Sequence, residues 1–188
     1  AAESPLMVLQ KQIDQILDVL KEPNYKDPIK RVPLRAQIEK YVHEVFDFNE
    51  FSARTVGRNW PSFSDAQKER FDKAFVNDDT LAKRLGNAFG SDADRPDDLA
   101  LGQGGDFQLD LLRHRIVPYA QLDLRFRAEI QTIVTLSDGK PVPVAYRMML
   151  KNGKWVVYDV LIENVSLIKN YRSQFQDVLT RGTPEQLI

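Results

Sequence analysis

An alternation of apolar and polar residues from Leu122 to Leu136 is the feature that most limits how this chain can fold. A period of two predicts a β-strand with one apolar side and one solvent-facing side. Only Ile133 interrupts the polar series. Because fifteen residues exceed the usual length of a strand, we expect this one to twist, bend or carry a bulge.

Two further apolar runs follow Asx-Gly pairs, which are signals for turns between strands. Residues 142–150 follow Asp138-Gly139, and residues 155–162 follow Asn152-Gly153. The three runs therefore predict an antiparallel sheet built from consecutive hairpins.

The register of the first hairpin follows from its two faces, since a slip of one residue would move every side chain to the other face. A two-residue loop would pair Val134 with Pro143 and mix the faces. A three-residue loop over residues 137–139, with the glycine in the left-handed region, keeps them separate. The predicted pairs are Val134 with Val142, Ile130 with Tyr146, and Glu129 with Arg147.

We expect the same three-residue loop in the second hairpin, over residues 151–153. Its apolar side chains would then pair on the face that the first hairpin defines. The predicted pairs are Met148 with Val156, Tyr146 with Tyr158, and Val144 with Val160.

Helical spacing of apolar residues predicts helices on both sides of the sheet in the chain. One helix ends before Pro23, another begins near Pro33, and Ser64 with Gln67 forms a capping-box pattern at the start of a later one. We assign the helical part to about residues 5–90, the sheet to about 107–163 and a closing helix to about 166–181. The predicted fold is a single α+β domain over residues 1–188. Its N-terminal helices and C-terminal helix pack on one face of a twisted antiparallel sheet.

Composition excludes several classes of function. The formal net charge of -1 and the balanced charges indicate no nucleic-acid partner. The absence of cysteine excludes disulfides, cysteine-zinc sites and a cysteine nucleophile. The two histidines, His43 and His114, are far apart in the chain, so we expect no metal site. No segment is long and apolar enough to span a membrane. Residues 1–4 resemble what remains after cleavage at a small-residue site.

We find no catalytic motif: the chain lacks a phosphate-binding glycine loop, a nucleophile elbow and a His-Glu metal helix. One enzyme hypothesis remains, in which a tyrosine and a carboxylic acid act on an apolar substrate inside a cupped sheet. Tyr146 and Tyr158 would face such a cup, but Asp159 and Glu163 are expected on the solvent-facing side. We therefore predict no catalytic residues and no cofactor.

The predicted sheet presents a broad apolar face toward the helices. These side chains either form an ordinary core or line a slot for an apolar ligand, and periodicity does not separate the two. The side chains expected to face the helices are Leu124, Phe126, Ile130, Val134, Val144, Tyr146, Met148, Val156, Tyr158, Val160 and Ile162.

Several short segments form a recognisable pattern along the chain. In the C-terminal half they are Asp138-Gly139-Lys140-Pro141-Val142, Tyr146-Arg147, Trp155-Val156-Val157-Tyr158-Asp159-Val160, Ile162-Glu163-Asn164-Val165-Ser166 and Asn170-Tyr171-Arg172-Ser173-Gln174-Phe175. In the helical half they are Phe46-Asp47-Phe48, Gly57-Arg58-Asn59-Trp60, Phe63-Ser64, Gln67, Arg70-Phe71 and Phe75. Together these segments closely resemble the MlaC family, the periplasmic phospholipid-binding proteins also called the toluene-tolerance auxiliary transport family. The chain departs from the family pattern at Leu81, at Asn164 and over residues 86–121.

The resemblance implies a monomeric periplasmic carrier with a phospholipid as cargo. Such a carrier shuttles lipid between an outer-membrane lipoprotein-porin complex and an inner-membrane ABC transporter, which maintains the lipid asymmetry of the outer membrane. Burial stabilises by about 0.8 kcal/mol per methylene, so two acyl chains represent on the order of 20 kcal/mol relative to water. The lipid would therefore pass from one apolar slot to another without dissolving.

We expect the apolar slot of this carrier to lie between the sheet and the helices. Core packing remains the alternative for each side chain, and an apolar-ligand enzyme or a lipid-free envelope adaptor remains the alternative for the protein. The predicted lipid-binding residues are Phe126, Ile130, Val134, Val144, Tyr146, Met148, Tyr158, Val160 and Ile162 on the sheet, with Phe71, Phe75, Leu81 and Leu85 on the helices.

Overall fold

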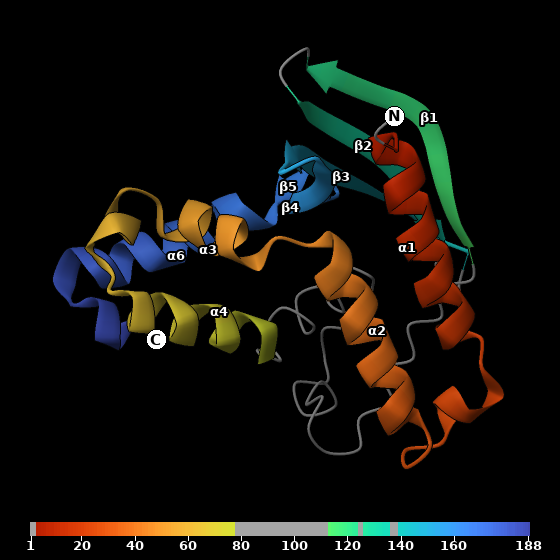
Figure 1. Cartoon of the computed structure of the whole chain (residues 1–188), viewed down its shortest axis with the longest axis horizontal. Helices are drawn as coiled ribbons and strands as arrows, with labels where there is room; N and C mark the ends of the chain where they lie inside the picture. Colours follow the sequence, from red (N-terminus) through yellow and green to blue (C-terminus); the bar gives the residue numbers. More distant parts are fainter. Residues whose placement is uncertain (1–2, 78–112, 124–125, 136–138) are drawn as a thin grey trace.

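The structure, a computed structural model, describes residues 3–77, 113–123, 126–135 and 139–188, with the backbone alone for residues 75–77 and 113–123. Its sheet is antiparallel, and the strands lie in chain order from β1 to β5. The strands are β1 (Arg113–Asp123), β2 (Arg127–Thr135), β3 (Pro141–Lys151), β4 (Lys154–Ile162) and the short β5 (Val165–Ser166). With helices before and after this sheet, the predicted α+β class is confirmed (Figure 1).

The prediction of one continuous strand over residues 122–136 is wrong. The chain reverses within this run, because Leu122 of β1 pairs with Ala128 of β2, and Asp123 pairs with Arg127. Phe126 has a φ of 71°, in the left-handed region that a bulky side chain rarely adopts and that ends an extended strand. The alternating run therefore forms a β-hairpin.

The register predicted between β2 and β3 is confirmed. Val134 pairs with Val142, and Ile130 pairs with Tyr146. Gly139, at the end of the connection, has a φ of 85°, as the predicted loop requires.

The register predicted between β3 and β4 is wrong. The turn contains two residues, Asn152 with φ 51° and Gly153 with φ 77°, which is the conformation of a type I′ turn. Met148 therefore pairs with Val157 instead of Val156. A β-bulge at Tyr158 then shifts the register, so that Val160 lies opposite Tyr146.

The described residues form five α-helices besides this sheet, and local hydrogen bonds determine where most of them begin. Ser4 Oγ accepts from Met7 N at 3.2 Å, and Ser166 Oγ accepts from Lys169 N at 3.2 Å. The predicted capping box is confirmed, since Ser64 N donates to Gln67 Oε1 at 2.9 Å. The helices are α1 (Pro5–Leu20), α2 (Arg31–Val45), α3 (Phe48–Val56), α4 (Asp65–Asn77) and α6 (Leu167–Arg181), with 3₁₀ turns at Pro23–Lys26, Gly57–Ser62 and Pro184–Gln186.

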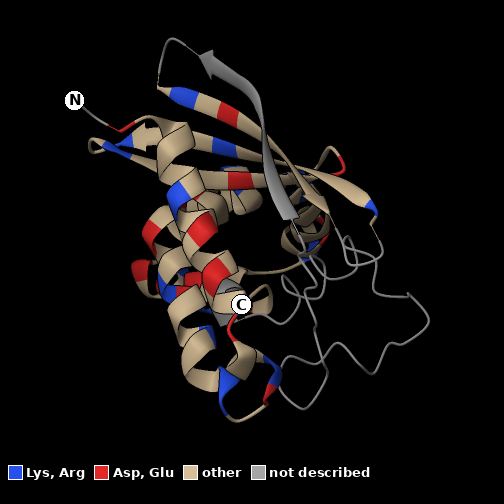
Figure 2. Cartoon of the chain, turned by 90° about the vertical axis from the view of Figure 1, so that its right-hand side faces the viewer, with Lys and Arg blue, Asp and Glu red and all other residues tan. Residues whose placement is uncertain are grey.

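The helices form two groups. One group is the α1–α2 hairpin, and the other consists of α3, α4 and α6, which lie beside the end of the sheet that carries β4 and β5 (Figure 1). A view from the side shows the sheet above and the helices beneath it (Figure 2). The short segment Phe46-Asp47 joins the two groups and pairs with the edge of β4, where Asp47 N donates to Val157 O at 2.8 Å.

The core is divided in the same way. The N-terminal cluster joins α1 and α2 to the sheet and consists of the buried residues Leu9, Val45, Ala128, Ile130, Met148 and Val157. The C-terminal cluster consists of Phe51, Val56, Phe63, Phe71, Val134, Val142, Val144, Tyr158, Ile162, Leu167, Ile168 and Tyr171.

Candidate functional site

One face of β2, β3 and β4 is almost entirely apolar, and we call it the apolar face. Strand pairing places its side chains in rows across the sheet, because paired residues of neighbouring strands project on the same side. The rows are Ala128–Met148–Val157, Ile130–Tyr146–Val160, Thr132–Val144–Ile162 and Val134–Val142. The structure thus brings together seven of the predicted site residues: Ile130, Val134, Val144, Tyr146, Met148, Val160 and Ile162.

The two ends of the apolar face pack against different helices. Met148, which is 0% exposed, belongs to the N-terminal cluster together with Leu9 of α1 and Val45 of α2. Val144 and Ile162 belong to the C-terminal cluster. At both ends the sheet and the helices therefore share a packed core.

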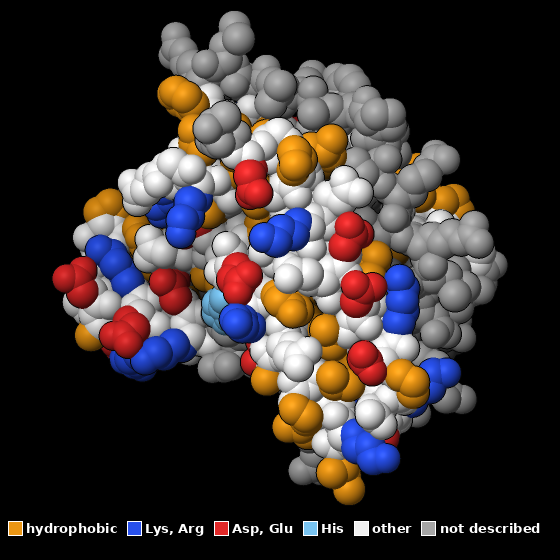
Figure 3. Space-filling model, turned by 45° about the vertical axis from the view of Figure 1, so that its right-hand side comes forward, with side chains coloured by type: hydrophobic (Ala, Val, Ile, Leu, Met, Phe, Trp, Pro, Cys, Tyr) orange, Lys and Arg blue, Asp and Glu red, His pale blue; other side chains and the backbone are white. Residues whose placement is uncertain are grey.

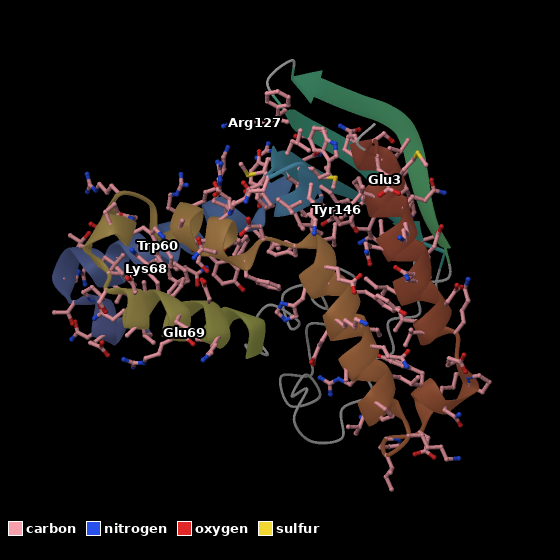
Figure 4. All side chains as sticks on the ribbon, in the orientation of Figure 1. Glu3, Trp60, Lys68, Glu69, Arg127 and Tyr146 are labelled. Atoms are coloured by element: carbon pink, nitrogen blue, oxygen red, sulfur yellow. The ribbon has the colours of Figure 1, made fainter. Side chains whose placement is uncertain are left out.

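Between these ends, two members of the row Ile130–Tyr146–Val160 are less completely buried than their neighbours. Tyr146 and Val160, which pair across β3 and β4, are half-buried, and both contact the N-terminal and the C-terminal clusters. Phe46, in the segment that joins α2 to α3, is also half-buried and also contacts both clusters. We call these three residues the junction. Figure 4 shows Tyr146 on the side of the sheet that faces the helices.

The hydroxyl group of Tyr146 is held in its neutral form. Burial raises the pKa of Tyr146 to about 12, and a hydrogen bond with the Thr132 side chain opposes this shift only in part. Thr132 Oγ1 in turn donates to Val144 O at 2.7 Å. The polar atoms of the apolar face are therefore bonded to one another, which is compatible with an apolar ligand beside them.

The carboxylate of Asp159, on β4, makes its hydrogen bonds away from the apolar face. The expectation that Asp159 faces solvent is wrong, because Asp159 is only 1% exposed. Its carboxylate accepts from Ser166 Oγ at 2.6 Å, from Ile168 N at 3.2 Å and from Arg147 Nη1 at 3.3 Å. Arg147 also donates to Glu129 Oε2 at 3.0 Å, across the strand pair that the sequence predicted. Asp159 thus fixes β5 and the start of α6 to the sheet.

Three predicted site residues of the described part of the chain lie outside the rows of the apolar face. The expectation that Phe126 faces the helices is wrong, since it is 64% exposed at the turn between β1 and β2. Tyr158, the extra residue of the bulge, lies under Arg54, whose guanidinium carbon is 4.4 Å from the ring centroid. Phe71 packs among aromatic rings of the second helical group, with centroid distances of 5.8 Å to Trp60, 6.0 Å to Phe63 and 5.6 Å to Phe175. The side chain of Phe75, and the whole of Leu81 and Leu85, lie outside the described residues.

Sequence reasoning did not identify Phe46 as a site residue. The signal was present, because Phe46-Asp47-Phe48 places two aromatic residues around a carboxylate at the end of a predicted helix. Asp47 caps α3, with its Oδ1 accepting from Glu50 N at 2.9 Å, so the chain turns here and Phe46 reaches the junction.

Two properties of the described residues bear on the kind of site. Within residues 3–77, 113–123, 126–135 and 139–188, no group of three His, Asp or Glu side chains is placed to hold a metal ion. In the same part of the chain, no helix combines the length and the apolar character needed to cross a membrane.

Comparisons with known proteins agree with the fold. The protein-family model described as MlaC protein matches residues 10–97 and 105–188. No curated protein matches the sequence. Among solved structures, a phospholipid-binding protein from Ralstonia solanacearum, determined in complex with a phospholipid, has a TM-score of 0.74 and 20% sequence identity. The match covers 98% of this chain and 93% of that chain, and it is a likeness of fold. Because the family model spans most of the sequence, the chain belongs to the MlaC family.

Proposed function

We propose that the protein is a periplasmic phospholipid carrier that holds acyl chains at the junction. The observation that carries the proposal is the partial exposure of Tyr146 and Val160 in the middle of the apolar face. Neighbours on the same face are completely buried, with Ile130 and Met148 both 0% exposed. Accessible apolar surface enclosed by a packed core is what a ligand slot between sheet and helices provides.

The position of the junction suits a lipid tail. It lies where the two groups of helices meet, so a chain lying there would contact the sheet on one side and both groups on the other. Each buried methylene contributes about 0.8 kcal/mol, so the slot needs length and apolar walls and no strong polar contact. Membership of the MlaC family and the fold shared with a phospholipid-binding protein support this assignment.

A slot for acyl chains also has consequences for the partners that the protein needs and for the chemistry of its site. A lipid with two long chains does not leave such a slot by dissolving, so the carrier must deliver it directly to another apolar site. We propose an outer-membrane lipoprotein-porin complex and an inner-membrane ABC transporter as the two ends of this route, which would maintain outer-membrane lipid asymmetry. A carrier of this kind needs no catalytic group, and the neutral Tyr146 hydroxyl serves to satisfy Thr132.

The test is mass spectrometry of the purified protein after extraction with organic solvent. We expect stoichiometric phospholipid in the wild type and none in Val160→Trp, whose ring would fill the junction. Val165→Trp is the matched control, because Val165 is 54% exposed on β5. Circular dichroism would establish that both variants fold.

Two results would contradict the proposal. A wild-type protein that contains no lipid and takes none from vesicles would be an adaptor. Turnover of an apolar ester or ketone that Tyr146→Phe abolishes would indicate an enzyme.

A further inference from the structure

Where the connection after α1 enters α2, two apolar side chains close together in the chain are exposed. Ile29 is 83% exposed and Val32 is 64% exposed. Val32 N donates to Ile29 O at 3.4 Å, so the two residues belong to one turn at the start of α2. This turn is the end of the helical hairpin that lies farthest from the sheet (Figure 1). We call residues 21–35 the tip.

Basic residues outnumber acidic residues in the tip. The tip contains five Lys or Arg residues and two acidic residues, which gives it a formal charge of +3 in a chain of net charge -1. Figure 3 shows hydrophobic and basic side chains gathered at the lower end of the molecule. The five cations are Lys21, Lys26, Lys30, Arg31 and Arg35.

Local hydrogen bonds hold the tip in this conformation. Oδ1 of Asp27 accepts from Ile29 N at 2.9 Å and from Lys30 N at 3.2 Å. Pro28 and Pro33, which flank the two apolar residues, restrict the backbone further. The exposed side chains are therefore presented by an ordered turn, so binding through them requires little additional ordering.

We propose that the tip docks on the surface of a bilayer that contains anionic lipids. Cations near such a surface are attracted to it, and apolar side chains at the same place can enter the boundary between headgroups and acyl chains. A protein partner fits this feature less well, because specific interfaces bury roughly 800 Å² on each side and the tip is the narrow end of one hairpin. The inference does not rest on the carrier proposal, since the tip lies away from the apolar face.

The test is co-sedimentation of the full chain with vesicles, measured as the fraction of protein in the pellet. Vesicles of phosphatidylethanolamine with phosphatidylglycerol are compared with vesicles of phosphatidylcholine alone. We expect binding to the anionic vesicles only, and we expect salt to weaken it, because salt screens exposed charges.

The double variant Ile29→Ser with Lys30→Glu removes one apolar side chain and reverses one charge, and its binding should fall roughly tenfold or more. The matched control is Val165→Ser with Lys169→Glu, which likewise removes one apolar side chain and reverses one charge, at exposed residues outside the tip, and should bind as the wild type does. Equal binding to both kinds of vesicle, no binding of the wild type, or equal loss in both double variants would overturn the proposal. Lipid extraction from the same protein is a separate measurement, so failure here leaves the carrier proposal standing.

Discussion

Ser166 Oγ lies 2.6 Å from Oδ2 of the buried Asp159 and donates a hydrogen bond to it. The same hydroxyl oxygen accepts from Lys169 N at 3.2 Å, as the N-cap of α6. One side chain therefore joins β4, β5 and α6.

Replacing Ser166 with Ala should lower the free energy of unfolding by about 1.5–3 kcal/mol, because a buried carboxylate loses a donor and a helix loses its cap. Urea denaturation measures the change. Ser173→Ala is the control, since the Ser173 hydroxyl is exposed and donates to Lys169 O of its own helix. Equal effects in the two variants would contradict the assigned role of Ser166.

Tyr146 should make the protein less stable at alkaline pH. Its folded pKa is raised to about 12 from the ordinary value of 10.0, so its contribution is complete below pH 10 and is lost as the pH rises toward 12. Over that interval the wild type should lose up to about 3 kcal/mol more than Tyr146→Phe. Denaturation curves of both proteins at a series of pH values test this, because the other tyrosines titrate in both.

Met148 and Val160 lie on the same face of the sheet but should respond differently to truncation. Met148 is completely buried in the N-terminal cluster, so Met148→Ala should cost about 2–5 kcal/mol of stability. Val160 is half-buried at the junction, and Val160→Ala should cost about 1 kcal/mol. Thermal and urea denaturation compare them. A larger loss at Val160 than at Met148 would mean that the junction is solidly packed.

The carboxyl group of Asp27 should titrate below its ordinary pKa of 3.8. Hydrogen bonds from Lys30 N and Ile29 N to the charged form are the main causes that lower the pKa. Stability that depends on this carboxylate is present above pH 3.8 and is lost as the pH falls through the lowered value. NMR titration should show the amide signals of Ile29 and Lys30 moving with the same midpoint. A midpoint at or above the ordinary value would contradict the structure of the tip.

The fold class and the pairing of β2 with β3 could be predicted from the sequence because the alternation in these strands is unambiguous. The turn at Phe126 could not. Leu122 and Ala128 are six residues apart and lie opposite each other, so a period of two continues through the turn without a break. An alternating pattern indicates which face of the sheet a residue occupies, but it does not indicate that the chain has reversed direction.

The second hairpin shows how two errors can cancel. Its turn is one residue shorter than predicted, which moves Val157 to the apolar face in place of Val156. The bulge at Tyr158 adds one residue and returns Val160 to the predicted face. Bulges have no reliable pattern in a single sequence, so Tyr146 and Val160 share a face as predicted although the predicted register is wrong.

The burial of Asp159 and the role of Phe46 depend on contacts between distant segments. Asp159 is covered because β5 and α6 follow β4 closely and supply donors to its carboxylate. Phe46 reaches the sheet because the chain between α2 and α3 runs along β4. Periodicity within one segment contains neither fact.

The pairing of Asp47 with Val157 has a consequence for self-association. A strand with free backbone groups at the margin of a sheet can recruit a strand from another molecule, which is a common origin of aggregates. In β4 the segment Phe46-Asp47 takes one stretch of that margin and β5 takes another, at Leu161 and Ile162. At high protein concentration, these stretches of β4 are therefore already paired with backbone of the same chain and do not accept a strand from another molecule.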